Sequence, residues 1–385
     1  MPTILQAMRR LWMVFILFLA FAPTAFADGL TPGEVYLLIK HARPNVQEPD
    51  GWASDLLDVM QTQSIPTSRE NICAAIAVID QESNFNANPT VPGLGKLAEK
   101  KLAEKFGHVP FLSGWVTDWL DNHPKGETSY LQRIRAAKTE RDLDLTYRAM
   151  VNDLGTTSNM SIVVQSGLLN RMIEERNNIS TIGSMQVSAH FALEEARLRR
   201  YLPMTLSDDY AVRDELYTRR GGIYYGVKQL LGYNSGYDRK IYRFADFNAG
   251  RYSSRNAAFQ HIISTLMKQN LARDGDLLLY DKSGRALSNV SSTEKALRSL
   301  STSARLGLTD MQIRNDLLLE KDDALVTTQT YLAIKNLYLR TTGKPAAFAE
   351  LPGIDLSSPK LSHKMTTASY AGSVDKRYNR CMAAR

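Results

Sequence analysis

The chain has 385 residues, of which 44% are hydrophobic and 23% are charged. This length is enough for one large domain or two modest ones, and the composition excludes both a disordered chain and a bundle of membrane-spanning helices. The formal net charge of +7 suits an anionic polymer such as peptidoglycan. Lys and Arg do not cluster with interleaved aromatic residues, so no nucleic-acid partner is expected.

The first 27 residues have the pattern of a secretory signal peptide. Two arginines precede the apolar run 11–21, and Ala25-Phe26-Ala27 places small residues at the two positions that signal peptidase reads. The alternative is a membrane anchor, but this run would span only about half of the bilayer core. We therefore expect export to the periplasm, cleavage near Ala27, and no transmembrane span in the mature chain.

The rest of the chain predicts a mainly α fold. An N-terminal helical segment, 28–66, is expected to hold the helices 31–41 and 52–61. Apolar residues at helical spacing then predict a helix that starts at Thr67, with Glu70 completing a capping box, and that ends near Glu82. Further helices are expected over 96–106, 131–152, 182–198, 214–231, 241–248, 253–269, 291–300, 310–319 and 322–340.

Proline, serine and basic residues in the last segment predict an extended C-terminal tail, 341–385. In an oxidising compartment, Cys73 and Cys381 are expected to form a disulfide that pins this tail to the helix holding Cys73. The alternative is two free cysteines, one buried and one exposed. The six histidines are scattered without ligand spacing, so we expect no metal site and no cofactor.

Glu82 is the residue best placed to act as an acid. It ends an amphipathic helix three residues after Ile79, so its carboxyl group leans toward the buried face. Loss of water and the negative end of the helix dipole should both raise the pKa of this group. A general acid for glycosidic cleavage needs such a raised pKa. The alternative for Glu82 is a solvated surface position.

Three segments resemble motifs of the lytic transglycosylases and goose-type lysozymes. Asp80-Gln81-Glu82-Ser83-Asn84-Phe85 is similar to their Glu-Ser-x-Phe motif, in which the glutamate is the catalytic acid. Gly183-Ser184-Met185-Gln186-Val187 resembles their Gly-x-Met-Gln segment, and Phe247-Asn248-Ala249-Gly250 resembles their aromatic-Asn-Ala-Gly motif. Tyr331 lies in a late helix, where these proteins often have a tyrosine that faces the acid.

This resemblance implies a lysozyme-like helical domain over 67–340 with Glu82 as the catalytic residue. The alternatives are that Met185 is a core residue, Gly250 a helix cap and Tyr331 a packing residue. The resemblance also implies a set of substrate-binding residues: Ser83, Gly183, Met185, Gln186, Phe247, Asn248, Ala249, Gly250 and Tyr331.

Nearly everything after residue 45 also resembles a bacterial cell-envelope family of unknown function typified by YaiW. The longest motifs that carry this resemblance are Arg219-Arg220-Gly221-Gly222-Ile223-Tyr224, the segment 242–251 and the segment 254–260. Some members of that family look like lipoproteins. This sequence has no lipidation cysteine, so association with the outer membrane lacks its usual signal here.

Two features depart from the transglycosylase pattern. Residues 90–180 form a large insertion, which could be a lid, a substrate-selecting wall or a partner surface, or could block the groove. Phe247 stands where tyrosine is usual, and Arg251 stands where proline is common. The hydroxyl that would touch sugar is therefore missing, although Arg251 could reach an anionic peptide stem.

The sequence offers no compelling second carboxylate beside Glu82. Asp80 points to another side of the helix, and Asp246 is expected to make a structural hydrogen bond. One-carboxylate chemistry favours a lytic transglycosylase that cleaves between N-acetylmuramic acid and N-acetylglucosamine, whereas a hydrolase would need Asp246. The rival interpretation is a non-catalytic lysozyme-like envelope protein that binds glycan or a protein partner.

Overall fold

The computed structural model describes residues 29–107, 112–156, 181–281, 284–356 and 365–384, and it confirms the mainly α class. The signal peptide expected over 1–27 lies outside these residues. None of the helices in these ranges is long and apolar enough to cross a membrane.

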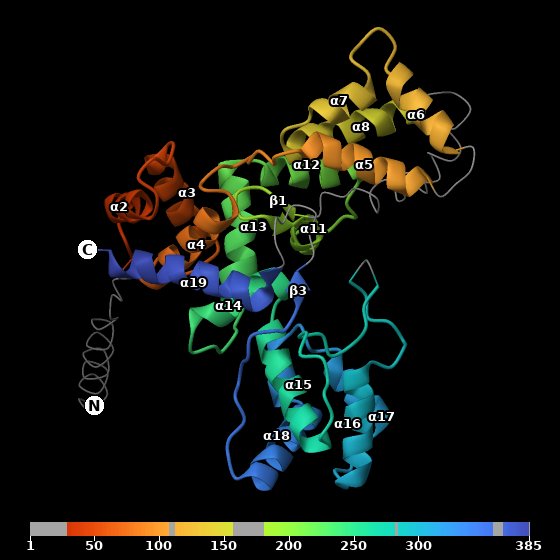
Figure 1. Cartoon of the computed structure of the whole chain (residues 1–385). Helices are drawn as coiled ribbons and strands as arrows, with labels where there is room; N and C mark the ends of the chain where they lie inside the picture. Colours follow the sequence, from red (N-terminus) through yellow and green to blue (C-terminus); the bar gives the residue numbers. More distant parts are fainter. Residues whose placement is uncertain (1–28, 108–111, 157–180, 282–283, 357–364, 385) are drawn as a thin grey trace, which may run out of the picture.

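The elements are α2 Pro32–Ala42, α3 Pro49–Thr62, α4 Arg69–Glu82, α5 Leu94–Gly107, α6 Leu112–Asn122, α7 Tyr130–Ala136, α8 Glu140–Thr156, β1 Thr181–Ile182, β2 Val187–Ser188, α11 Ala189–Leu198, α12 Leu206–Leu216, α13 Arg219–Leu231, α14 Lys240–Ala249, α15 Ser253–Met267, α16 Ser292–Ser303, α17 Asp310–Leu317, η1 Asp323–Thr327, α18 Gln329–Thr342, β3 Asp355–Leu356, β4 Met365–Thr366 and α19 Thr367–Ala383 (Figure 1).

Helix α4 starts one residue later than the sequence predicts. Its N-cap is Ser68, whose side chain accepts a hydrogen bond from the Asn71 amide, so the capping box expected from Thr67 and Glu70 is wrong. The carbonyl oxygen of Thr67 instead accepts a hydrogen bond from the amide of Leu30, 3.0 Å away. This contact holds Thr67 outside the helix and leaves the capping position to Ser68.

The helix expected over 182–198 begins only at Ala189. The residues before it form a short antiparallel hairpin in which Ile182 pairs with Val187. Gly183 and Gln186 have φ angles of 81° and 49°, which an α-helix does not contain. A turn with two left-handed residues therefore interrupts the helical pattern, and the side chain of Ser188 caps α11.

The expectation of a fully extended C-terminal tail is also wrong. Residues 367–383 form helix α19, which lies along α4 and α14 (Figure 1). Tyr370, Ala371, Val374 and Cys381 are buried on one face of this helix. Their spacing is helical, but the polar and basic residues between them hid the pattern in the composition.

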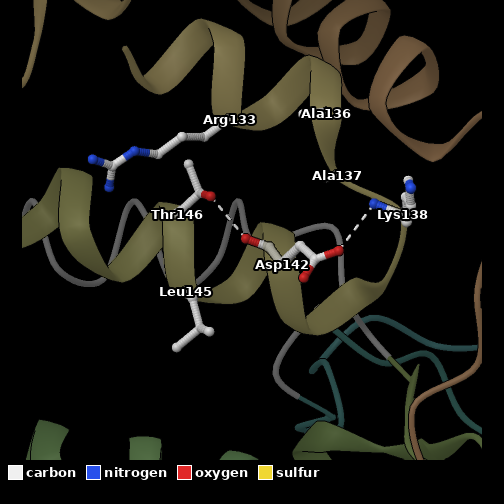
Figure 2. Close-up of a pocket in the computed structure, with 7 residues that line it drawn as sticks. All are labelled: Arg133, Ala136, Ala137, Lys138, Asp142, Leu145 and Thr146. Carbon is white, nitrogen blue, oxygen red and sulfur yellow. Dashed lines mark hydrogen bonds between the residues drawn. The ribbon is translucent and has the colours of Figure 1, made fainter. Parts of the chain in front are cut away.

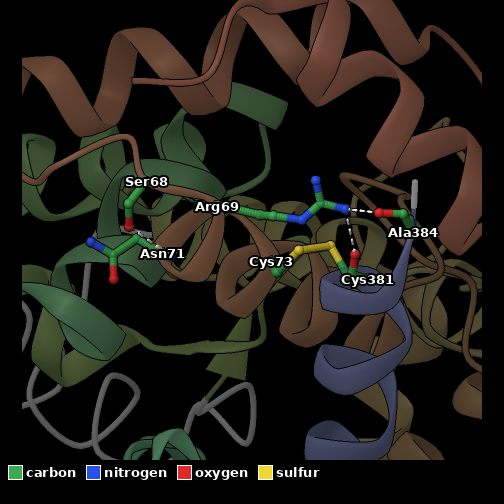
Figure 3. Close-up of a disulfide and its surroundings, with 6 residues drawn as sticks. All are labelled: Ser68, Arg69, Asn71, Cys73, Cys381 and Ala384. Atoms are coloured by element: carbon green, nitrogen blue, oxygen red, sulfur yellow. Dashed lines mark hydrogen bonds between the residues drawn. A yellow bond between two sulfur atoms is a disulfide. The ribbon is translucent and has the colours of Figure 1, made fainter. Parts of the chain in front are cut away.

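The disulfide predicted between Cys73 and Cys381 is confirmed, with a Cα–Cα distance of 5.5 Å (Figure 3). Beside it, the guanidinium group of Arg69 donates hydrogen bonds to the carbonyl oxygens of Cys381 and Ala384. The start of α4 is thus joined to the last turn of α19 both covalently and by hydrogen bonds.

The buried apolar side chains form separate clusters. The largest cluster joins α2–α4, α11–α14 and α19 and includes residues of α5, α7 and α8, and the second joins α15–α18 with the loop around Leu277. A smaller cluster of Leu120, Tyr130 and Leu131 holds α6 and α7 together. The predicted domain limits 28–66, 67–340, 90–180 and 341–385 remain predictions.

Glu320 gives the second cluster an expected pH dependence. Its side chain is fully buried and accepts hydrogen bonds from the Leu277 amide and the Tyr280 hydroxyl, and burial raises its pKa from an ordinary 4.5 to about 7. In the unfolded chain Glu320 ionises near pH 4.5, whereas in the folded protein it stays protonated up to about pH 7. The free energy of unfolding should therefore fall by up to about 3 kcal/mol as the pH rises from about 4.5 to 7.

Urea unfolding across this pH range measures the effect. Glu320→Gln keeps a neutral acceptor at the same place, so its curve should lose most of the fall. An equal fall in both proteins would assign the pH dependence to other groups.

Candidate functional site

Helix α4 positions Glu82 at its last residue. Ile72, Ile76 and Ile79 are buried in the main core, so the helix is fixed along its length. At its end, the hydroxyl of Ser83 donates a hydrogen bond to the Ile79 carbonyl oxygen at 3.1 Å and accepts one from the Asn86 amide at 3.3 Å. Ser83 is buried and ties the helix end to the following loop.

The loop after Glu82 leaves the helix in an uncommon conformation. Asn84 and Phe85 have φ angles of 54° and 63°, although neither is glycine. The ring of Phe85 is buried edge-on against Trp52, with 5.4 Å between centroids, and the Asn84 side chain accepts a hydrogen bond from Arg43. These contacts offset a backbone cost of about 1–2 kcal/mol per residue. The chain direction beside Glu82 is therefore closely defined.

Asp80 serves the structure of the same region. Its carboxylate is buried and forms ion pairs with Arg43 at 2.8 Å and with Arg377 of α19 at 3.0 Å. Asp80 thereby links α2, α4 and α19 around the end of α4.

Glu82 itself is half-buried and faces helix α19. The hydroxyl of Tyr370 donates a hydrogen bond to Oε1 of Glu82. Burial raises the pKa of the Tyr370 hydroxyl well above its usual range, and the charge of Glu82 adds to this rise. Tyr370 therefore remains a donor at neutral pH. The sequence reasoning missed this residue because the tail was expected to be extended.

The sequence left Tyr331 open between facing the acid and packing in the core, and the structure shows the packing role. It is buried in the second cluster, where its ring packs against that of Phe259 with 4.9 Å between centroids. Tyr331 is thus a packing residue of α15 and α18. The tyrosine that contacts Glu82 comes from α19 instead.

The Gly-Ser-Met-Gln segment forms the turn of the β1–β2 hairpin. Met185 is fully buried, and a Cβ added to Gly226 of α13 would lie only 2.2 Å from its sulfur atom. Met185 is therefore a core residue at the place where α13 meets the hairpin, rather than a residue that lines an open cleft. This is the alternative that the sequence left open.

The side chain of Gln186 is bonded within the protein. Its amide nitrogen donates to the Gly183 carbonyl oxygen at 3.2 Å and to Oε2 of Glu140 at 3.4 Å, and its oxygen accepts from Thr181 at 3.0 Å. Glu140 is buried at the first residue of α8. Helix α8, which lies in the segment 90–180 predicted to be an insertion, thus contacts the motif directly through Glu140.

Gly183 and Gly250 predict different responses to alanine. Gly183 has a φ of 81°, and its added Cβ would lie 2.1 Å from the Leu216 carbonyl oxygen, whereas Gly250 has a φ of 105° with no atom within 4 Å. We expect Gly183→Ala to lower the free energy of unfolding by about 3–5 kcal/mol, and Gly250→Ala by only about 1–3 kcal/mol from backbone strain. Urea titration measures both. Equal losses would contradict the close approach at Gly183.

The aromatic-Asn-Ala-Gly segment ends helix α14. Phe247 is buried, Asn248 is exposed and Ala249 is half-buried. Gly250 is the C-cap of α14, and its amide donates to the Asp246 carbonyl oxygen at 2.8 Å. Asn248 is thus the residue of this segment that presents its side chain to solvent.

Asp246 is buried at the centre of a hydrogen-bond network. Burial raises the pKa of its carboxyl group, while the hydrogen bonds that it accepts lower it. This arrangement is structural and leaves Asp246 unsuited to be a second acid for hydrolysis. Its five donors are the hydroxyls of Tyr233, Tyr237 and Ser253 and the amides of Tyr252 and Ser254, at 2.7–3.0 Å.

Arg251 is also held inside the protein. Its guanidinium group donates to the Lys228 carbonyl oxygen at 2.6 Å, lies 3.7 Å from Glu195, and stacks over the rings of Phe191 and Tyr233. Burial lowers the pKa of this group. These contacts do not leave Arg251 extended toward an anionic peptide stem.

A shallow hollow of about 430 Å³ lies between α7 and α8 (Figure 2). Asp142, on its wall, caps α8 by accepting hydrogen bonds from the amides of Lys138 and Thr139. None of the predicted site residues lines this hollow, so it is no extension of the Glu82 site. The residues that line the hollow are Arg133, Ala136, Ala137, Lys138, Asp142, Leu145 and Thr146.

Within the described residues, no group of His, Cys, Asp and Glu could hold a metal ion.

Nearly the whole chain matches one protein family. Residues 45–384 match a family described as protein of unknown function (DUF1615). The chain belongs to the DUF1615 family. It is 38% identical over 370 residues to the uncharacterized protein YaiW of Escherichia coli strain K12, which covers 94% of this chain and 93% of YaiW. The resemblance to YaiW is therefore confirmed. No solved structure matches the chain, and membership of the lysozyme-like superfamily remains a prediction.

Proposed function

We propose that this DUF1615 protein is a peptidoglycan lytic transglycosylase in which Glu82 acts as the single acid and base. The observation that carries the proposal is the hydrogen bond from the buried Tyr370 hydroxyl to Glu82, at the end of a rigid, buried helix. The phenol holds the Glu82 carboxyl group at a fixed place, and the half-buried position of Glu82 is what favours its protonated form, because a donated hydrogen bond by itself favours the carboxylate. The proposal includes export to the periplasm with cleavage near Ala27.

The proposed reaction uses one carboxyl group twice. Glu82 first gives its proton to the oxygen that bridges N-acetylmuramic acid and N-acetylglucosamine, and the bond from that oxygen to C1 breaks. The N-acetyl group of the substrate stabilises the positive charge at C1. The C6 hydroxyl then attacks C1 and gives its proton to Glu82, which forms the 1,6-anhydro product without consuming water. Tyr370 would act as a positioning residue for the carboxylate.

The second candidate is a non-catalytic envelope protein that binds glycan or a protein partner. The observations that favour it concern the residues expected to line the cleft. Met185 and Phe247 are buried, and the amide of Gln186 is bonded to Thr181 and Glu140. Substrate contacts would then fall to Asn248 and to residues that the motifs do not include.

Digestion of peptidoglycan sacculi distinguishes the two candidates. The protein from residue 28 onward should release anhydro-muropeptides, and Glu82→Gln should lower their release by about a thousandfold or more, because the carboxyl group serves both steps. Tyr370→Phe should cause a smaller loss of about tenfold with a shifted pH profile. Liquid chromatography with mass spectrometry measures the products.

Two results would contradict the enzymatic proposal. Sacculi that bind the protein but release no product would favour the binding module. Products with reducing ends would indicate a hydrolase. Equal melting temperatures of wild type and Glu82→Gln would show that the mutant is folded.

A further inference from the structure

The last two residues of α11 and the start of the loop that follows present an apolar tip to solvent. Residues 197–203 read Arg-Leu-Arg-Arg-Tyr-Leu-Pro, and all seven are exposed. The side chains of Leu198, Tyr201 and Leu202 are 82%, 106% and 76% exposed, so they make almost no contact with the rest of the protein. Three large exposed apolar side chains in one short segment indicate an interaction surface.

The arginines of this segment are held close behind the apolar side chains. Arg199 donates to the hydroxyls of Tyr224 and Tyr225 at 2.8 and 3.1 Å, and it stacks over both rings. Both partners are hydroxyl groups and neither is a carboxylate, so these two contacts do not offset the positive charge of Arg199. The guanidinium group is therefore fixed at the base of the tip.

The other two arginines keep about half of their side chains exposed. Arg197 lies 3.9 Å from Asp209, and Arg200 lies 2.9 Å from Asp208. These two carboxylates offset part of the basic charge. The segment therefore combines exposed apolar side chains with three arginines whose long-range attraction is modest.

We propose that residues 197–203 dock on a phospholipid surface. Leu198, Tyr201 and Leu202 enter the headgroup boundary of the bilayer, and the arginines at the base of the tip bind lipid phosphates. Tyrosine and arginine both favour this boundary, where a side chain is half apolar and half wet. The apolar side chains stand beside arginines, which matches the bilayer boundary, where acyl chains lie next to phosphates.

This contact would be peripheral, since none of the described helices could span a bilayer. Because Asp208 and Asp209 offset the arginines, the apolar insertion carries most of the affinity. We therefore expect binding to zwitterionic vesicles as well, with only a few-fold gain from anionic lipid. The inference is independent of whether Glu82 is catalytic.

Co-sedimentation with vesicles tests the proposal. The protein from residue 28 onward should bind vesicles of phosphatidylethanolamine and phosphatidylglycerol. The double variant Leu198→Ser and Leu202→Ser should lower the partition coefficient roughly tenfold, because both apolar insertions are lost. The matched control is Leu37→Ser and Met311→Ser, whose leucine and methionine are 62% and 74% exposed elsewhere on the surface.

The control variant should bind as wild type does. A second measurement uses the variant Tyr201→Trp, whose additional indole fluorescence should shift to shorter wavelength when vesicles are added. The proposal is overturned if wild type does not sediment with vesicles, if both double variants bind alike, or if the fluorescence of the Tyr201→Trp variant does not change. Loss of binding to sacculi in the tip variant, with vesicle binding unchanged, would also overturn it.

Discussion

Asp246→Ala is expected to lower the free energy of unfolding by about 5 kcal/mol or more. The Asp246 carboxylate is buried and accepts five hydrogen bonds, and these join α14 to α15 and to the loop around Tyr237. Removing the acceptor leaves several buried donors unsatisfied, and each costs about 1–3 kcal/mol. The loss is comparable to the whole stability of many proteins. Thermal and urea unfolding measure it.

Asp58→Ala is the matched control for Asp246→Ala. The Asp58 carboxylate is half-exposed and pairs only at the surface with Arg220, so its loss should cost less than about 1 kcal/mol. A stable, cooperatively unfolding Asp246→Ala protein would show that the network contributes little. The loss of free energy of unfolding for Asp246→Asn should lie between these two values. One oxygen of the asparagine side chain still accepts hydrogen bonds, whereas its NH2 group faces donors.

Loss of the Cys73–Cys381 disulfide is expected to lower the free energy of unfolding by about 5 kcal/mol. The cysteines are 308 residues apart in sequence, and a crosslink that closes such a long loop removes much entropy from the unfolded chain. The disulfide also holds the last turn of α19, the helix that carries Tyr370. We therefore expect weaker contact between Tyr370 and Glu82 as well.

The measurement compares melting temperatures with and without reductant. Wild type should lose stability on reduction, whereas the double variant Cys73→Ala and Cys381→Ala should start low and not respond. If reduction left the melting temperature of wild type unchanged, packing of α19 on α4 would be sufficient without the crosslink.

The candidate site was only partly predictable. The position of Glu82 at the end of a buried helix follows from the local apolar spacing of Ile72, Ile76 and Ile79. Tyr370 was not predicted, because its contact with Glu82 joins residues 288 positions apart. Tyr331 was chosen from its place in a late helix, and it packs in the other cluster.

The motif segments show the same limit. Gly250 was left open between a helix cap and a substrate-binding residue, and it is the C-cap of α14. Gly183 was expected to bind substrate, and the structure also gives it a backbone role, since glycine tolerates its positive φ angle. Met185 could not be assigned between core and cleft, because its burial depends on α13. Gln186 was expected to bind substrate, and its bond to Glu140 of α8 could not be read from the sequence.

The sequence by itself determined that Glu82 ends a helix and that the fold is mainly α, and it favoured a disulfide between Cys73 and Cys381 over two free cysteines. These features follow from local periodicity and from the pairing chemistry of two cysteines. Only the tertiary structure decided that 367–383 is a helix against α4, that Tyr370 contacts Glu82, and that five donors converge on Asp246. Those features depend on packing between distant segments, whose energy no local pattern encodes.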